Sequence, residues 1–184
     1  MDRMGRIRRR RRRYRPGVGP GDVRKRYAKK MEYLGNVHDG STGEIAPGYW
    51  LCEVVAADPY GEKIHPLYGE LYAQKAEDFQ SENDQLLKAI RTVSTATEKK
   101  GIWAVDIGGD RRKIIIPMLD NELQFVIRQD GDRHILLPRG AKRSVADAAR
   151  WCKKSFEKTI EVEREGYTTK KHLKMGALPV RLPE

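Results

Sequence analysis

Strand-like and helix-like segments alternate through the middle of the chain, and this order constrains the fold more than any other feature. The apolar stretches 48–57 and 64–72 predict two strands, and the short turn between them favours a hairpin. Further strand-like segments at 102–106 and 123–128 each follow a segment with helical character. Because helices that alternate with strands pack on a common sheet, the sequence predicts an α/β fold.

Start signals locate the two helices. Ser81 and Asp84 have the spacing of a capping box, and apolar residues then recur on one face at helical spacing. Asp110 is a candidate N-cap for a second helix over 111–119, which Pro117 is expected to shorten or bend. Both helices therefore connect consecutive strands of the predicted sheet.

The last third of the chain has weaker patterns. Small and apolar residues predict a helix over 144–154, and alternating apolar and charged residues predict a half-exposed strand over 159–165. Another strand-like segment, LPVRL, follows at 178–182.

The net charge of +11 is concentrated at the N-terminus. Residues 1–30 hold 14 Lys and Arg against 2 acids, whereas the remaining residues are close to neutral. An arginine run from 8 to 13 cannot form a hydrophobic core, and Pro and Gly dominate 16–21, so residues 1–21 are predicted to be a disordered arm and linker. Such an arm is suited to binding DNA or RNA. Because residues 1–15 contain no lysine, an N-terminus read from an abnormal start or frame is an equal alternative.

Composition argues against several classes of protein. No stretch reaches the ~18 consecutive apolar residues of a membrane helix, so no membrane partner is expected. Cys52 and Cys152 lie far apart without a CxxC spacing, which predicts buried free thiols in a reducing, cytoplasmic compartment. No HxxxH, HExxH or GxSxG motif is present, so neither a histidine metal site nor a serine hydrolase is expected. The four histidines are His38, His65, His134 and His172.

Asp106 is the strongest single candidate for chemistry. It follows a short apolar strand-like segment, and Gly108 and Gly109 come soon after it. Ligands bind at this edge of α/β sheets, and a carboxylate there suits Mg²⁺. The structural alternative is that Asp106 begins a polar turn and Asp110 caps the following helix. The string VDIGGD also resembles the phosphate-binding hairpin of sugar kinases and actin-like ATPases, with Asp110 in place of the usual hydroxyl residue.

Six strings, taken in order, resemble the central part of bacterial insertion-sequence transposases of the DDE type, the large IS-four group. The resemblance runs from about Asp22 to the C-terminus. The strings are YAKKMEYL (27–34), HDGSTGEIAPGYWLCEVV (38–55), KIHPLYGELY (63–72), SENDQLLKAI (81–90), GIWAVDIGGDR (101–111) and LQFVIRQDGDRHIL (123–136).

This resemblance implies an RNase H-like fold in which two Asp and one Glu hold two Mg²⁺ or Mn²⁺ ions for DNA strand cleavage and transfer. Asp106 matches the family's second Asp, which follows the fourth strand and serves as metal ligand and catalytic residue; Ile107 stands where relatives carry Arg. Gly19 occupies the position of the family's first Asp. No Tyr-x2-Arg-x3-Glu segment follows Asp106 to supply the third acid. We therefore expect a catalytically incomplete fragment, with an incomplete RNase H-like mixed sheet that lacks its first strand and has flanking helices.

The resemblance also implies partners and boundaries. Transposon-end DNA is the expected partner, with a homodimer in the intact family and a location at the bacterial nucleoid. Residues 22–157 are expected to form the partial catalytic domain and 158–184 the start of a β-rich insertion. Four arginines near the presumed active edge are candidates for DNA phosphate contacts, with ordinary solvated charge as the alternative. They are Arg111, Arg112, Arg128 and Arg133.

Two other functions remain as alternatives. The first is a non-catalytic nucleic-acid-binding protein that acts through its arginine-rich arm. The second is a nucleotide binder of the sugar-kinase and actin-like type, based on the VDIGGD string.

Overall fold

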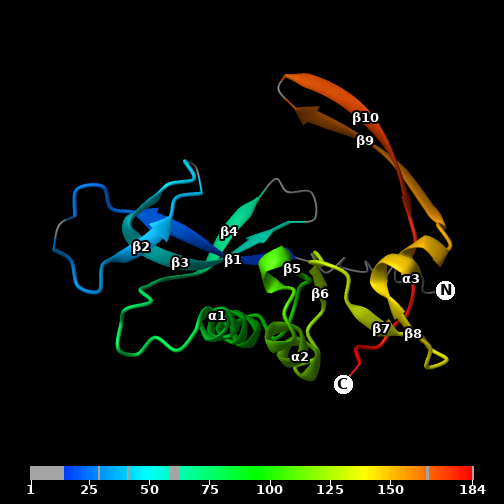
Figure 1. The fold of residues 1–184 in the computed structure, drawn as a ribbon, viewed down its shortest axis with the longest axis horizontal. Coiled ribbons are helices and arrows are strands. Elements are labelled where there is room, and N and C mark those ends of the chain that lie inside the picture. The colour runs from blue at the N-terminus through cyan, green and yellow to red at the C-terminus, as the bar shows by residue number, and fades with distance from the viewer. Residues whose placement is uncertain (1–14, 29, 41, 59–62, 165, 184) are drawn as a thin grey trace, which may run out of the picture. The chain divides into compact units, whose positions relative to one another are not determined.

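The computed structural model describes residues 15–28, 30–40, 42–58, 63–164 and 166–183 (Figure 1). The chain divides into two compact units, residues 1–130 and 131–184. The division falls after Asp130, whereas the start of the insertion was expected at residue 158. Most of the arginine-rich arm, residues 1–14, lies outside the described residues.

A six-stranded mixed sheet organises the first unit (Figure 1). Its central strand, β1, is antiparallel to β3 and parallel to β5, and β5 is parallel to β6. Along its edge away from β1, β3 pairs antiparallel with both β2 and β4. The strands are β1 (Arg15–Arg24), β2 (Gly35–His38), β3 (Ile45–Ala57), β4 (Ile64–Tyr72), β5 (Trp103–Val105) and β6 (Phe125–Ile127). The predicted α/β class, the mixed sheet and the β3–β4 hairpin are therefore confirmed.

Two helices connect the strands of the parallel half. Helix α1 (Glu82–Ala96) leads from β4 to β5, and α2 (Arg112–Asp120) leads from β5 to β6. Ser81 caps α1 as predicted, since its side chain accepts a hydrogen bond from the Asp84 N–H at 3.2 Å. The apolar face of α1 is buried against the sheet, which confirms the helical spacing seen in the sequence. The core is formed by Val18, Cys52, Val54, Tyr72, Leu87, Ala89, Ile90, Val93, Trp103, Val105, Ile114, Met118 and Leu123.

Strand β1 occupies residues for which the sequence predicted a linker, so that prediction is wrong for residues 15–21, and no strand is missing at the centre of the sheet. Gly and Pro disfavour a strand locally, but β1 pairs with β3 along its whole length, from Arg15 to Arg24. Val18 is only 6% exposed and joins the core, while β5 pairs on the other side. Pairing with two neighbours and burial of Val18 outweigh the local preference, because strand propensity depends strongly on context.

Helix α2 confirms the predicted helix but not its predicted cap. Its N-cap is Arg111, which makes no side-chain capping bond. Asp110 instead accepts a hydrogen bond from the Asp130 N–H at 2.7 Å, which ties the start of α2 to the segment after β6. Pro117 lies inside the helix, which continues to Asp120. Its missing N–H removes one helical hydrogen bond without ending the helix.

The second unit consists of two hairpins and a short helix. Strands β7 (His134–Leu136) and β8 (Lys142–Ser144) form one hairpin, and helix α3 (Val145–Trp151) follows directly. Strands β9 (Phe156–Arg164) and β10 (Tyr167–Met175) form the other. These elements confirm the predicted helix and strand, whereas the strand-like segment 178–182 contributes only an isolated bridge between Arg181 and Leu136. In the described part of the chain, no helix is long and apolar enough to cross a membrane.

Candidate functional site

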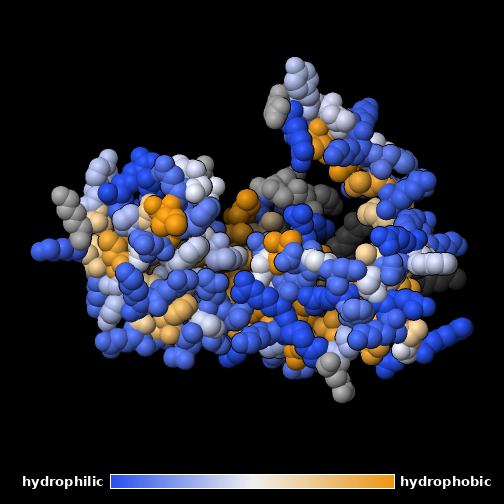
Figure 2. Space-filling model, in the orientation of Figure 1, coloured by the Kyte–Doolittle hydropathy of each residue, from blue (hydrophilic) through white to orange (hydrophobic). Residues whose placement is uncertain are grey.

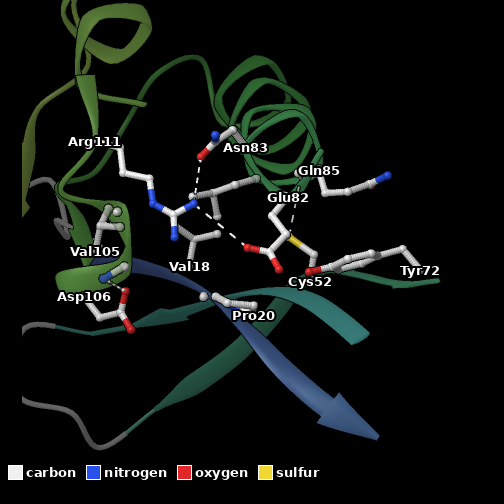
Figure 3. A pocket seen from close by; sticks show the side chains of 14 residues that line it. Val18, Pro20, Cys52, Tyr72, Glu82, Asn83, Gln85, Val105, Asp106 and Arg111 are labelled. Carbon is white, nitrogen blue, oxygen red and sulfur yellow. Dashed lines mark hydrogen bonds and ion pairs between the residues drawn. The ribbon is translucent and has the colours of Figure 1, made fainter. Parts of the chain in front are cut away.

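The carboxyl end of β5 and the middle of β1 meet at a small cavity. The two strands are parallel, and Val18 is the register partner of Val105. One residue further along each strand, Gly19 and Asp106 both line the cavity, which the first turn of α1 also borders (Figure 3). Its volume of about 40 Å³ has room for a few water molecules, well below the ~300–1,000 Å³ of typical ligand pockets. The two positions that the resemblance matched to the first and second Asp are therefore neighbours.

Asp106 is an exposed carboxylate that also shapes the backbone after β5. It caps the short 3-10 turn Ile107–Gly109, and its Oδ1 accepts a hydrogen bond from the Gly108 N–H at 3.0 Å. Gly109 is required by space, because a Cβ at this position would lie 2.2 Å from Cγ1 of Val105. The polar turn expected as the structural alternative is thus present, and one carboxylate oxygen is already engaged in it.

Arg111 extends across the cavity toward α1 (Figure 3). Its Nη1 donates to Oδ1 of Asn83 at 3.1 Å and lies 4.0 Å from Oε2 of Glu82. Glu82 also accepts a hydrogen bond from Gln74 at 3.1 Å. The guanidinium therefore has partners on α1, and this candidate DNA contact carries a partly neutralised charge.

The other candidate arginines are not gathered at the cavity. Arg112 is exposed in the first turn of α2. The backbone N–H of Arg128 donates to the Val105 carbonyl at 3.2 Å, which places this residue at the same sheet edge. Arg133 is half-buried and belongs to the second unit. The structure thus associates Arg111 and Arg128, but not all four predicted arginines, with the end of β5.

Glu82 and Asn83 line the cavity but were missed in the sequence. The sequence feature that could have indicated them is their position directly after the helix cap Ser81. The first turn of a helix that follows an antiparallel hairpin can face the edge of the sheet. Without the strand order, nothing in the sequence separated them from the other polar residues of α1.

The acid set differs from the one implied by the resemblance. Gly19 has no side chain, and the cavity's second carboxylate, Glu82, comes from the start of α1 and is held by Arg111 and Gln74. Among the residues that the structure describes, no three His, Cys, Asp or Glu side chains are grouped to bind one metal ion. Two Mg²⁺ or Mn²⁺ ions need several oxygen ligands and charge compensation, so this side-chain set does not fit that pair.

Cys52 also lines the cavity and is buried. Burial, with smaller contributions from Glu70 and Glu53, raises the pKa of its thiol to about 11. The thiol therefore stays protonated at neutral pH and is a poor nucleophile. Its predicted role as a buried free thiol is confirmed, while Cys152 is free and half-buried.

The VDIGGD string does not form a phosphate-binding hairpin. The strand before it, β5, pairs in parallel with β6, and the two glycines belong to a 3-10 turn that leads into α2. A hairpin would instead require an antiparallel partner directly after the glycines.

Neither a scan against known protein-family models nor a search of curated protein sequences found a match to this chain.

Proposed function

We propose that this chain is a catalytically incomplete relative of the DDE transposases with an RNase H-like sheet. One observation carries the proposal. The six-string resemblance assigned the first two acids to Gly19 and Asp106, which lie 87 positions apart in sequence. The parallel register of β1 and β5 makes them neighbours at one cavity. If the short edge strand β2 is set aside, Asp106 also follows the fourth strand of the sheet, as the resemblance implies.

The incompleteness follows from Gly19. In two-metal DNA cleavage, carboxylates shared between the ions neutralise their charge and fix their separation. Asp106 is the carboxylate at the end of β5, and one of its oxygens accepts a hydrogen bond from the Gly108 N–H. The cavity's other carboxylate, Glu82, is held by Arg111 and Gln74. The neighbouring guanidinium of Arg111 further disfavours a divalent cation there. The proposed function is thus DNA association without strand cleavage.

Restoring the missing acid tests this relationship directly. A Cβ on Gly19 would meet no atom within 4 Å, so Gly19→Asp can add a carboxylate beside Asp106 without displacing a neighbour. We expect Gly19→Asp to bind Mn²⁺ more tightly than the unmodified chain by roughly an order of magnitude, because ligand charge sets affinity for hard cations. Electron paramagnetic resonance of free Mn²⁺ measures this affinity.

Two further variants make the test specific. Gly69 on β4 also has open space around its Cβ position, so Gly69→Asp adds the same charge elsewhere on the sheet. It should leave Mn²⁺ affinity unchanged. Adding Asp106→Ala to Gly19→Asp should remove the gain. Equal Mn²⁺ binding by the Gly19 and Gly69 variants would contradict the proposed pairing of the two acid positions.

A further inference from the structure

The loop between β1 and β2 combines positive charge with an exposed aromatic ring. Residues 24–30 read RKRYAKK, five basic residues without an acid. Tyr27, at the centre of this string, is 93% exposed, and Met31 and Tyr33 on the same loop are exposed as well. Strongly hydrophilic residues project at the end of the unit formed by this loop, at the left of the view (Figure 2). A fully exposed ring among cations contributes nothing to a core.

Two nearby carboxylates pair with Arg24 at the base of the loop, and a third accepts a backbone hydrogen bond. Arg24 Nη1 lies 2.8 Å from Oδ2 of Asp39, and its Nη2 lies 3.5 Å from Oε2 of Glu44. Oδ1 of Asp22 accepts a hydrogen bond from the Gly40 N–H at 3.2 Å. These bonds hold the base of the loop against the turn between β2 and β3.

Three cations of the loop remain available to a partner. Lys25, Arg26 and Lys30 form no ion pair with any residue in the described part of the chain. Lys25, Arg26 and Tyr27 line an open hollow of about 590 Å³, within the ~300–1,000 Å³ range of ligand pockets. Asp22 and the Arg24–Asp39 ion pair complete its lining, and both carboxylates are engaged in the bonds given above. The hollow therefore has unpaired positive charge and an aromatic ring at its border.

This combination matches one kind of partner. Single-stranded nucleic acid offers phosphates to cations and unpaired bases to aromatic rings, and a basic surface with exposed aromatics is how proteins bind it without sequence preference. In a duplex the bases are stacked on one another and do not offer their faces to a side chain. An acidic protein would satisfy the cations but would leave Tyr27 without a role.

The geometry points to a single-strand binding site on the basic–aromatic loop, here Lys25, Arg26, Tyr27 and Lys30. In this site the lysines and the arginine contact phosphates, and Tyr27 stacks on a base. The loop continues from β1, six residues beyond Gly19, which corresponds to roughly 20 Å along an extended strand. The inference deepens the nucleic-acid partner of the proposed function, but it does not depend on Asp106 or on cation binding.

Fluorescence anisotropy of the full chain with a labelled oligo-dT strand of about 16 nucleotides tests the site. We expect Tyr27→Ala to weaken binding about fivefold or more, the usual loss for one stacked base, without changing the salt dependence. Tyr27→Phe keeps the ring and should keep the affinity. Lys25→Gln with Arg26→Gln should make the slope of log K against log salt shallower by about 1.4, because two phosphate contacts are lost.

A matched control separates the loop from general charge effects. Tyr167 in the second unit is 77% exposed, and Tyr167→Ala should leave affinity unchanged. The arginine run is the same in every variant, so it contributes a constant background. Unchanged binding by Tyr27→Ala, an equal loss in Tyr167→Ala, or an equal loss on a duplex of the same length would overturn the stacking site. Those results would leave the Mn²⁺ test of Gly19→Asp unaffected, so the two proposals fail separately.

Discussion

Lys88 Nζ lies 2.5 Å from Oε1 of Glu70 and joins the middle of α1 to the edge strand β4. The second oxygen of the same carboxylate accepts a hydrogen bond from the Tyr68 hydroxyl. Both donors stabilise the ionised carboxylate, so Lys88 first and Tyr68 second lower the pKa of Glu70 below its ordinary value. Burial, and then the same contact with Glu70, raise the pKa of Tyr68. This network is a polar link between a helix and the sheet.

Acid should weaken this link in a defined direction. Because the pKa of Glu70 is lower in the folded state, its contribution is complete above the unfolded value of about 4.3 and is lost as pH falls through the folded value. Glu70→Gln should therefore reduce the pH dependence of stability below about pH 5, by less than about 1 kcal/mol for so accessible a pair. Urea denaturation at pH 7 and at acid pH measures it. Glu77→Gln, on an exposed turn, is the control and should leave the pH dependence intact.

Ile114 tests whether α2 belongs to the core of the first unit. Its side chain is 0% exposed and packs in the main cluster. Ile114→Ala should lower the free energy of unfolding by about 2–5 kcal/mol, because it leaves a cavity as well as removing buried apolar surface. Ile64→Ala, at a position that is 67% exposed, should cost less than about 0.5 kcal/mol. Similar urea midpoints for the two variants would contradict the described packing.

Gly109 and Gly19 form a matched pair at the cavity. A Cβ on Gly109 would lie 2.2 Å from Cγ1 of Val105, whereas a Cβ on Gly19 would meet nothing within 4 Å. Gly109→Ala should therefore destabilise the unit by about 1–3 kcal/mol through overpacking. Gly19→Ala should change stability little. Thermal denaturation of both variants measures the difference, and a reversed order would show that the backbone after β5 differs from this description.

Much of the fold could be predicted because its signals are local. The strands around 48–57 and 64–72 carry β-branched and aromatic residues. Ser81 marks the start of α1 by capping it. β1 could not be predicted in this way, since its stability depends on pairing with β3, which begins more than twenty residues later. The prediction of Asp110 as a helix cap was wrong for a similar reason, because its carboxylate accepts a hydrogen bond from the distant Asp130 N–H.

The candidate site was predictable only in part. Asp106 was found because an apolar strand that ends in a carboxylate is a local pattern. Its neighbour Gly19 entered only through the spacing implied by the resemblance, and Glu82 was missed because it reaches the cavity through the packing of α1. Residues that meet across elements leave no periodic signal in a single sequence.

Strand cleavage is the activity that the site should lack. Supercoiled DNA with Mn²⁺ is the most permissive substrate, since one nick relaxes it. With Gly19 in place of an acid, the unmodified chain and Asp106→Ala should both give only background nicking, because one carboxylate cannot hold two cations for attack on a phosphodiester. Agarose gels separate supercoiled from nicked DNA. Nicking that Asp106→Ala abolishes would mean that other acids complete the site and that the chain is an active nuclease. Nicking that survives Asp106→Ala would instead show that the cleavage does not depend on the carboxylate at the end of β5.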